Sequence, residues 1–453
     1  MAASAIGTTT AVSTSDRPIS ADTATSPGLA DGAGEFSEPP TIHDLRAHFA
    51  PVFEQIAQGA LEREQNRELA HGAVELLCES GFTKVRLPRK LGGFGASLDQ
   101  LLDLLIDLAA ADSNLPQALH GHFMFTEIHQ HQSQGEVSDW WLSEVAAGRL
   151  FANALVELPP ATGARPVVIT PRDGDVSRGA TVTGDKFYST GSLFADYILV
   201  LGKQPGSEDD TYVVVDTRDP EVELIDDWNG IGQKLTASGT TKFHHAVVNA
   251  ERAMTLAVPT GPLGFPFLWL ILAATHAGIA RAAMNDAAAY VAARRRTYVH
   301  GTAELPSQDP LVQNVVGSIS AKASAARHIV MGAARELEAA LETTRDVRSL
   351  DEPTFLDAYS AASVSASEAS VAAADLSLDA ANLLFETGGA SSLLADKQLD
   401  RHWRNARVLA SHTPGNYRLK SIGDYRINGT VPPLSARVRN SDPSSAPSEG
   451  ENK

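Results

Sequence analysis

The sequence predicts a mainly helical α+β protein in which two helical regions flank a set of short strands. Between Ile42 and about Leu150, apolar residues recur at helical spacing. From about Pro159, the pattern changes to short β-branched runs separated by turn residues. Long Ala-rich helical segments then follow between about Pro262 and Ile422. The predicted order along the chain is therefore helices, strands and a helix bundle.

Each region has its own signals. The first contains LLDLLIDLAA and AHGAVELLCESGF, where Gly81 follows the apolar run as a helix stop. The second contains GATVTGDKFY, DYILVLG and TYVVVDT, and its closely spaced turn residues indicate a small antiparallel barrel or sandwich. The third has many small residues on long helices, which permit close helix packing in a bundle.

The chain is long enough for more than one core. Its 453 residues, of which 43% are hydrophobic, predict two or three domains. We place a helical domain at residues 41–150, a barrel at 151–258 and a helix bundle at 259–434. The ends, residues 1–40 and 435–453, have too little apolar content to offset the entropy of ordering, so we expect both to be disordered.

Charge and hydropathy exclude several classes of partner. The formal net charge of -18 leaves no broad cationic surface for nucleic acid or an anionic membrane. The N-terminus lacks the cationic start and apolar core of a secretory signal. The longest apolar run, FPFLWLILAA, is shorter than the roughly 20 residues that cross a bilayer. We therefore expect a cytoplasmic protein.

Four longer segments, in this order, carry a resemblance to a known family. They are VRLPRKLGGFGAS, VTGDKFYSTGSLFADYILV, DDWNGIGQKLTASGTTKFHHAVV and LDRHWRNARVLASHTPGNYRLKSIGDYRING. Over residues 42–434 the chain resembles the acyl-CoA dehydrogenase superfamily. The last two segments look particularly like its dibenzothiophene monooxygenase and sulfur-acquisition branch. The resemblance implies an N-terminal helical domain, a central antiparallel β-barrel and a C-terminal four-helix bundle.

The residues available for acid-base chemistry favour that branch. A dehydrogenase of this superfamily needs a carboxylate as the base that removes an α-proton. At the two family positions for it, no Asp or Glu occurs from Arg401 to Gly423 or between Glu251 and Asp286. The first position instead holds His412, a residue type that can donate or accept a proton near neutral pH.

The resemblance implies a two-component monooxygenase that uses reduced FMN, with FAD as a possible alternative. Such enzymes form a flavin hydroperoxide from dioxygen and insert one oxygen atom at S, N or an aromatic carbon of a small organic substrate. By the same resemblance His412 and Thr190 are the catalytic residues. The implied cofactor contacts are Asn153, Lys186, Ser189, Thr190, Arg296, Ala390, Ser391 and His412. For each of these residues, an ordinary packing, capping or surface role remains the alternative.

The resemblance also implies substrate contacts at Gln117, His122 and Trp228, in a pocket that differs from that of the dibenzothiophene enzyme. The histidines around Gln117 also raise the question of a metal. On a helix, His122 and His129 share one face whereas His120 and His131 share another, so four-way coordination would require a broken helix. We therefore predict no metal site.

The resemblance implies several partners: dioxygen, a small-molecule substrate and a separate NAD(P)H-dependent flavin reductase, since the chain shows no nicotinamide-binding βαβ unit. We expect a homotetramer, with a dimer as second choice, because the family completes its flavin site between subunits. Two alternatives remain open. One is an FAD-dependent acyl-CoA dehydrogenase with its base elsewhere, and the other is a non-catalytic binding or assembly module.

Overall fold

The computed structural model describes residues 36, 38–131, 135–207, 209–250, 264–345, 347 and 351–433. The predicted tail at 1–40 therefore lies almost wholly, and the tail at 435–453 wholly, outside the described residues. The first helices are α1 (Ile42–Asn66), α2 (His71–Glu79), α3 (Leu98–Ala111), α4 (Asn114–His131) and α5 (Glu136–Ala146). The strands are β1 (Phe151–Ala154), β2 (Val168–Arg172), β3 (Asp175–Ser189), β4 (Tyr197–Lys203), β5 (Asp210–Asp216), β6 (Val222–Ile225) and β7 (Gly239–Val248). The last helices are α6 (Phe265–Ala293), α7 (Pro310–Thr344), α8 (Pro353–Leu383), α9 (Arg401–Ala410) and α10 (Gly415–Asn428).

Local sequence explains where the first helices begin. At α1 the hydroxyl of Thr41 accepts from the backbone N–H of Asp44, whose carboxylate accepts in return from the Thr41 backbone N–H at 2.9 Å. Ser97 and Gln100 form the same reciprocal cap at α3. Each cap satisfies backbone donors that the first helical turn leaves free. The LGGFGA run precedes this second cap as a turn, as its composition predicts.

The strands form one curled sheet rather than a purely antiparallel barrel. Its order is β1-β4-β2-β3-β7-β6, and β5 pairs with β4. The pairs β2–β3, β3–β7, β4–β5 and β6–β7 are antiparallel, but β1 runs parallel to β4, and β2 also meets β4 in parallel at Val168 and Lys203. The prediction of an antiparallel sheet was therefore wrong for the contacts of β4 with β1 and β2. The reason is topological, because β1 enters the sheet directly from α5 and has no hairpin partner.

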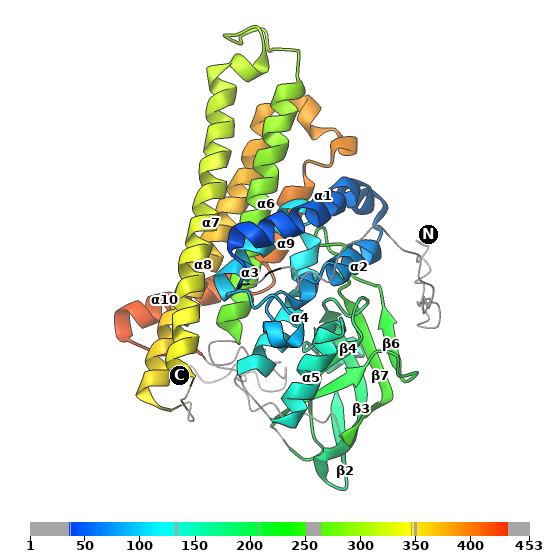
Figure 1. Ribbon diagram of the computed structural model, residues 1–453. Helices are drawn as coiled ribbons and strands as arrows, with labels where there is room; N and C mark the ends of the chain where they lie inside the picture. The colour runs from blue at the N-terminus through cyan, green and yellow to red at the C-terminus, as the bar shows by residue number, and fades with distance from the viewer. Residues whose placement is uncertain are drawn as a thin grey trace, which may run out of the picture.

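Three long helices, α6, α7 and α8, pack together and dominate the C-terminal region (Figure 1). The shorter helices α9 and α10 pack against α8, and α9 also contacts α6. Figure 1 shows the N-terminal helices between this bundle and the sheet, with α10 on the side of the bundle remote from the strands. The sequence thus predicts a helix bundle correctly, although its fourth member is split into short helices.

Helix α6 is the apolar centre of the bundle. It is 29 residues long and, alone among the described helices, apolar enough by composition to cross a membrane, yet 83% of its most apolar window is buried inside the protein. Burial against neighbouring helices accounts for this composition, as in the core helices of globular proteins. One apolar cluster runs through all three regions and includes Phe82, Val182 and Ala334. The regions therefore share a continuous core.

Candidate functional site

A close approach between α4 and β1 builds the centre of the candidate site. At Gly121 of α4, an added Cβ would lie 3.2 to 3.3 Å from backbone atoms of Ala152 and Asn153. Glycine therefore lets the helix pack directly on the strand backbone. Gly191, after β3, lies even closer to α4, because a Cβ added there would be only 2.3 Å from the Ala118 carbonyl oxygen. These contacts bring α4, β1 and the end of β3 together.

Three side chains meet at this junction. The Nδ1 of His120 lies 2.6 Å from the Gln117 carbonyl, so this nitrogen carries the hydrogen and donates it. Its Nε2 is then the acceptor for the Asn153 side-chain amide at 3.0 Å. The His412 ring stands nearly perpendicular to that of His120, at 5.9 Å and 82°. The predicted residues Asn153 and His412 are thus joined by His120, which we had considered only as a metal ligand.

His412 lies in the turn that follows α9, where its backbone N–H donates to the Leu409 carbonyl at 3.1 Å. Its side chain is exposed, although its ring lies against that of His120. Desolvation, with further contributions from His120 and Arg418, lowers the pKa of His412 to about 3. At neutral pH the imidazole is therefore neutral. It can donate and accept hydrogen bonds, but it holds no extra proton to release, which revises the expectation from sequence.

A row of hydroxyl groups joins Thr190, which follows β3, to Ser238 and Thr236, which precede β7. The Ser238 hydroxyl donates to the Thr190 hydroxyl at 2.8 Å and lies 2.8 Å from that of Thr236. The Thr236 hydroxyl in turn donates to the Gln233 carbonyl at 3.0 Å. Thr190 is therefore held in a fixed position, which is what a side chain that orients a bound ring requires.

Tyr188, two residues before Thr190, is a site candidate that the sequence analysis missed. It occupies a bulge between β3 and β7 and has a φ of 58°, a strained value for an aromatic residue. Its ring is 52% exposed and stands perpendicular to that of Trp228 at 5.9 Å. The bulge thus turns an aromatic face out of the sheet beside the predicted substrate contact Trp228. The signal was present, since Tyr188 lies inside the matching run KFYST.

The other two predicted contacts in that run are buried and behave differently. The Lys186 ammonium donates to the Glu157 carboxylate at 2.7 Å and the Leu155 carbonyl at 3.4 Å. Lys186 therefore ties the segment after β1 to the sheet, and no observation here supports direct contact with a cofactor. The hydroxyl of Ser189 is wholly buried and has no hydrogen-bond partner within the described chain.

Two predicted substrate contacts on α4, Gln117 and His122, differ in their hydrogen-bond partners. Gln117 is 5% exposed, and its buried Oε1 has no partner among the described residues. His122, by contrast, is wholly buried and its Nε2 lies 2.8 Å from the Thr83 carbonyl, so Nε2 donates there. Burial lowers the pKa of His122 to about 4. In this structure His122 belongs to the helical core, and a substrate contact finds no support.

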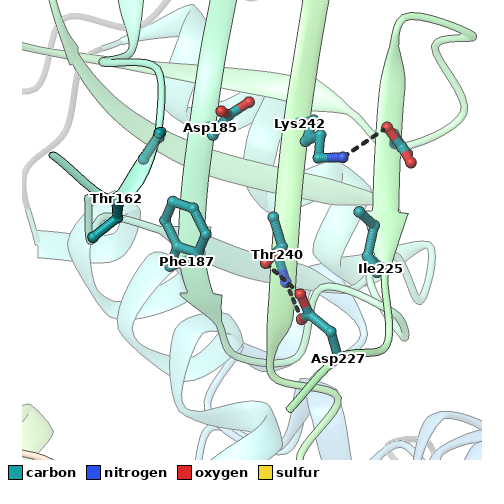
Figure 2. A pocket seen from close by; sticks show the side chains of 10 residues that line it. Thr162, Asp185, Phe187, Ile225, Asp227, Thr240 and Lys242 are labelled. Carbon is teal, nitrogen blue, oxygen red and sulfur yellow. Dashed lines mark hydrogen bonds and ion pairs between the residues drawn. The ribbon is translucent and has the colours of Figure 1, made fainter. Parts of the chain in front are cut away.

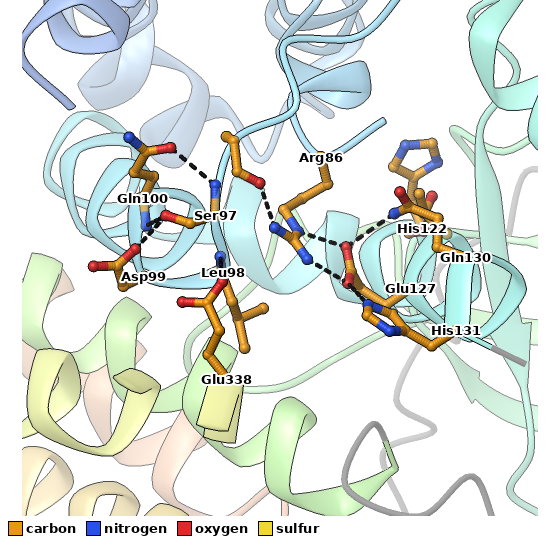
Figure 3. Close-up of polar contacts among 12 residues, drawn as sticks. Arg86, Ser97, Leu98, Asp99, Gln100, His122, Glu127, Gln130, His131 and Glu338 are labelled. Carbon is orange, nitrogen blue, oxygen red and sulfur yellow. Dashed lines mark hydrogen bonds and ion pairs between the residues drawn. The ribbon is translucent and has the colours of Figure 1, made fainter. Parts of the chain in front are cut away.

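The histidines of α4 diverge as their spacing predicts. His129 contacts the Ser138 hydroxyl at 3.0 Å, and His131 lies 3.4 Å from the Glu127 carboxylate. His122 and His131 both appear in Figure 3, where His131 lies beside Glu127. Within the part of the chain that the structure describes, no group of three or more His, Cys, Asp or Glu side chains could hold a metal ion.

Three predicted cofactor contacts lie at the far end of the bundle. Arg296 follows the end of α6 and its side chain is exposed, as are Ala390 and Ser391. The Ser391 hydroxyl contacts the Tyr290 hydroxyl at 2.7 Å, and Arg294 donates to the Thr387 carbonyl. The structure thus brings these segments near one another. It does not bring them near His412, because about 40 Å of α6 separates its two ends at 1.5 Å per residue.

A separate hollow of about 500 Å³ lies against β3, β6 and β7 (Figure 2). Its charged side chains are already paired. The Asp185 carboxylate contacts Arg165 at 2.6 Å, and Lys242 lies 3.7 Å from Glu223. The carboxylate of Asp227 accepts from the Thr240 hydroxyl at 2.6 Å. Asp185 and Lys242 thus have partners of opposite charge and Asp227 has a hydrogen-bonded hydroxyl partner, so the hollow offers a weaker case for a ligand than the junction at His412.

Comparison with known proteins gives this arrangement a context. The model of the acyl-CoA dehydrogenase C-terminal domain matches residues 270–417. The "Probable FMNH2-dependent monooxygenase SfnC" of Pseudomonas putida is 26% identical over 387 residues, which cover 83% of this chain and 93% of that protein. Dibenzothiophene monooxygenase of Mycolicibacterium goodii is also 26% identical, over 82% of this chain and 91% of that enzyme.

Two solved structures have the same fold. Methanesulfinate monooxygenase MsuC from Pseudomonas fluorescens superposes with a TM-score of 0.74 at 23% identity, covering 86% of this chain and 98% of that one. FMN-bound TdsC from Paenibacillus sp. A11-2 gives 0.75 at 22% identity, with the same coverage. Residues 270–417 therefore match the acyl-CoA dehydrogenase C-terminal domain, and the chain has the acyl-CoA dehydrogenase-like fold. Its homologues include dibenzothiophene and FMNH2-dependent monooxygenases.

Proposed function

We propose that this chain is a monooxygenase that uses reduced FMN to insert one oxygen atom from dioxygen into a small organic substrate. The observation that carries the proposal is the neutral cluster of His412, His120 and Asn153. By the resemblance, His412 occupies the sequence position where a dehydrogenase of this fold would need a carboxylate. The names of the relatives point the same way. We propose oxygenation at S, N or an aromatic carbon, and sulfur compounds are the first to test because two of the relatives are named for them.

The polar groups left free at the junction suit a flavin. The Ser189 hydroxyl and the Gln117 Oε1 are buried without partners in the described chain, and Thr190 is held by its neighbouring hydroxyls. A flavin ring offers both donors and acceptors along its edge, which would satisfy such groups. When bound, reduced FMN supplies the electrons that activate dioxygen.

The residues of this chain then have distinct tasks. Asn153 and the Gln117 carbonyl fix the tautomer and orientation of His120, and His120 in turn presents its edge to His412. His412, kept neutral by its surroundings, can hold one hydrogen bond to the reacting oxygen. Tyr188 and Trp228 present an aromatic surface against which a planar substrate or ring can pack.

The same geometry disfavours acyl-CoA dehydrogenation. Among the described residues, no carboxylate forms a hydrogen bond or ion pair with His120, His412 or Asn153. A neutral imidazole with its pKa lowered to about 3 is a weak base for removing an α-proton. The second alternative, a non-catalytic module, leaves the free buried groups at Ser189 and Gln117 without explanation.

We further propose that Arg296 and Ser391 serve the flavin of a neighbouring copy of the chain. They lie about 40 Å along α6 from the His412 end, a distance longer than one FMN molecule. Two copies arranged about a two-fold axis would bring each far end to the other's junction. Light scattering should show a homotetramer, or at least a dimer. A stable monomer at micromolar concentration would contradict this assignment.

The central test supplies photoreduced FMN and labelled dioxygen (¹⁸O₂) to the purified protein with methanesulfinate, dibenzothiophene or indole. We expect a product that carries one labelled oxygen, and a separate NAD(P)H-dependent flavin reductase should replace photoreduction. Two results would contradict the proposal: no measurable FMN binding, or anaerobic reduction of bound FAD by an acyl-CoA. The second result would show that the chain is a dehydrogenase.

A further inference from the structure

Helix α10 buries a guanidinium group that no other observation explains. Arg418 is only 5% exposed, and its Nε and Nη1 atoms have no hydrogen-bond partner within the described chain. No ion pair to Arg418 is present among the described residues, and desolvation lowers its pKa. Burying a cation without a counter-charge is costly, so such an arrangement indicates that a ligand supplies the missing charge.

The surroundings of Arg418 are aromatic and neutral. Its guanidinium lies 6.0 Å from the centre of the Trp269 ring on α6, and the buried Nε1 of that ring also lacks a partner in the described chain. About two turns further along α6, the His276 Nδ1 contacts the Ser377 hydroxyl at 2.7 Å. Arg418 is near enough to both His276 and His412 to lower their pKa values. Three donor atoms without partners in the described chain, two on Arg418 and one on Trp269, and one uncompensated positive charge thus lie beside the candidate site.

Two partly buried arginines of this protein differ from Arg418 because each has a carboxylate partner, although the Nε of Arg63 also lacks a hydrogen-bond partner in the described chain. Arg63 contacts Asp112 at 2.9 Å, and Arg404 contacts Glu64 at 2.9 Å. Since the sequence supplies acidic partners elsewhere, their absence around Arg418 in the described chain is a specific feature of this position.

We propose that Arg418, with Trp269 beneath it, binds the anionic group of the substrate, a carboxylate or a sulfur oxoanion such as a sulfinate. The inference rests on the proposed monooxygenase function and names the class of substrate for that site. A guanidinium pairs with two oxygens of such a group at once, and the neighbouring indole N–H can donate to it as well. The reacting atom of the substrate would then lie on the His412 side of its anionic group.

The position of α10 favours the substrate over the flavin phosphate as the source of the anion. Figure 1 places α10 on the side of the bundle remote from the sheet, whereas the predicted flavin contact Thr190 lies at the end of β3. The anion at Arg418 therefore approaches from the bundle side, opposite the strands. The predicted phosphate contact, Arg296, lies at the other end of α6.

Calorimetry on the full chain in chloride-free buffer can test the proposal without turnover. The probes are methanesulfinate, acetate and dimethyl sulfone, an uncharged compound with the same SO2 group as methanesulfinate, together with FMN and riboflavin, which lacks the phosphate. The variants are Arg418→Met and Arg418→Lys. The matched control is Arg426→Met on the same helix, because Arg426 forms an exposed ion pair with Glu368 at 3.0 Å.

We expect the wild type to bind at least one of the two anions and not dimethyl sulfone. Arg418→Met should raise the Kd of that anion roughly 10- to 100-fold, the loss typical of a charge-assisted pair. The anion Kd of Arg418→Lys should lie between those of the wild type and Arg418→Met. The anion Kd of Arg426→Met should equal that of the wild type, and the FMN affinity should be the same in all variants. If Arg418→Met fails to fold, the anion Kd of Arg418→Lys and the comparison of charged with uncharged probes still test whether Arg418 binds the anion.

Three results would overturn the inference. They are no anion binding by the wild type, equal binding of dimethyl sulfone, and an unchanged anion Kd in Arg418→Met. A fourth, weaker FMN binding with normal riboflavin binding in Arg418→Met, would assign the residue to the flavin phosphate instead. Because none of these measurements requires oxygen transfer, failure here is distinct from failure of the proposed function.

Discussion

Arg86 and Arg418 show two ways in which one protein can bury a guanidinium. Arg86 meets Glu127 through two parallel hydrogen bonds of 2.7 and 2.8 Å, and it also donates to the Ala96 carbonyl (Figure 3). Burial alone would raise the pKa of Glu127, but Arg86 and His131 outweigh it and lower the value to about 2. The charges of Arg86 and Glu127 therefore compensate each other. Around Arg418, two donor atoms and the positive charge have none within the described chain.

This difference distinguishes a buried arginine that stabilises the fold from one that can bind a ligand. A satisfied ion pair fixes the orientation of α4 relative to the preceding loop and leaves nothing for a ligand to do. An unsatisfied cation destabilises the free protein and is stabilised by whatever anion arrives. The junction at His412 resembles the surroundings of Arg418 in one respect. The Ser189 hydroxyl and the Gln117 Oε1 are also buried there without a hydrogen-bond partner in the described chain.

The largest expected effect is at His412. His412→Ala should leave FMN binding nearly unchanged, since contacts along the whole cofactor supply that affinity. It should reduce productive oxygen transfer by roughly 10² to 10⁴, the range of a positioned polar group in catalysis. Electrons from reduced FMN would then appear as hydrogen peroxide in place of product.

The measurement follows product and peroxide together with excess reduced FMN. His122→Gln is the matched control, because His122 lies in the core and should leave the ratio of product to peroxide unchanged. Normal coupling in His412→Ala would show that His412 has only a structural role.

Breaking the satisfied pair should affect stability and not chemistry. Glu127→Gln leaves Arg86 as a nearly buried cation with an incomplete partner, so the free energy of unfolding should fall by about 3 to 5 kcal/mol. Urea unfolding measures this loss. The double variant Arg86→Met/Glu127→Leu should recover most of it, since no charge then remains uncompensated. A loss below about 1 kcal/mol in Glu127→Gln would mean that solvent reaches this pair.

A smaller effect is expected at the far end of the bundle. If Arg296 contacts the flavin phosphate of a neighbouring copy, Arg296→Ala should weaken FMN binding by about 1 to 3 kcal/mol. Riboflavin binding should not change, because riboflavin carries no phosphate. Fluorescence titration of both flavins distinguishes the two results, and Arg295→Ala is the neighbouring surface control. Equal FMN affinity in Arg296→Ala and wild type would remove Arg296 from the site.

Periodicity and turn residues were sufficient to predict the order of helices, strands and bundle. They could not predict that β1 pairs parallel to β4, because strand pairing depends on contacts between distant segments. At the site, the matching runs pointed to His412, Asn153 and Thr190, which carry their own chemical signals. The unpaired state of Arg418 has no signature in sequence, because it depends on which side chains the fold keeps away.

Buried histidines determine how the stability of the protein depends on acid pH, and Arg418 contributes at His276. Burial lowers the pKa of His122 and His129 to about 4 and, together with Arg418 and Arg407, that of His276 to about 3. In the unfolded chain these imidazoles titrate near 6.5. Between about pH 6.5 and 4 the unfolded state therefore binds more protons than the folded state, so the free energy of unfolding should decrease as the pH falls. Each fully buried imidazole contributes a slope of up to about 1.4 kcal/mol per pH unit.

Urea unfolding at pH 7, 6 and 5 measures this slope, and His276→Gln should lower it by the share of one imidazole. Arg418→Met gives the sharper comparison, because removal of the neighbouring charge should let His276 bind a proton at a higher pH. Since burial is the larger cause of the low pKa of His276, the slope should then fall in added urea measurements at pH 4 and 3, even though no histidine has been changed. A slope that is identical in wild type and Arg418→Met would show that the guanidinium is too well solvated, or too distant, to act on His276. That result would also weaken the case that Arg418 is an uncompensated charge.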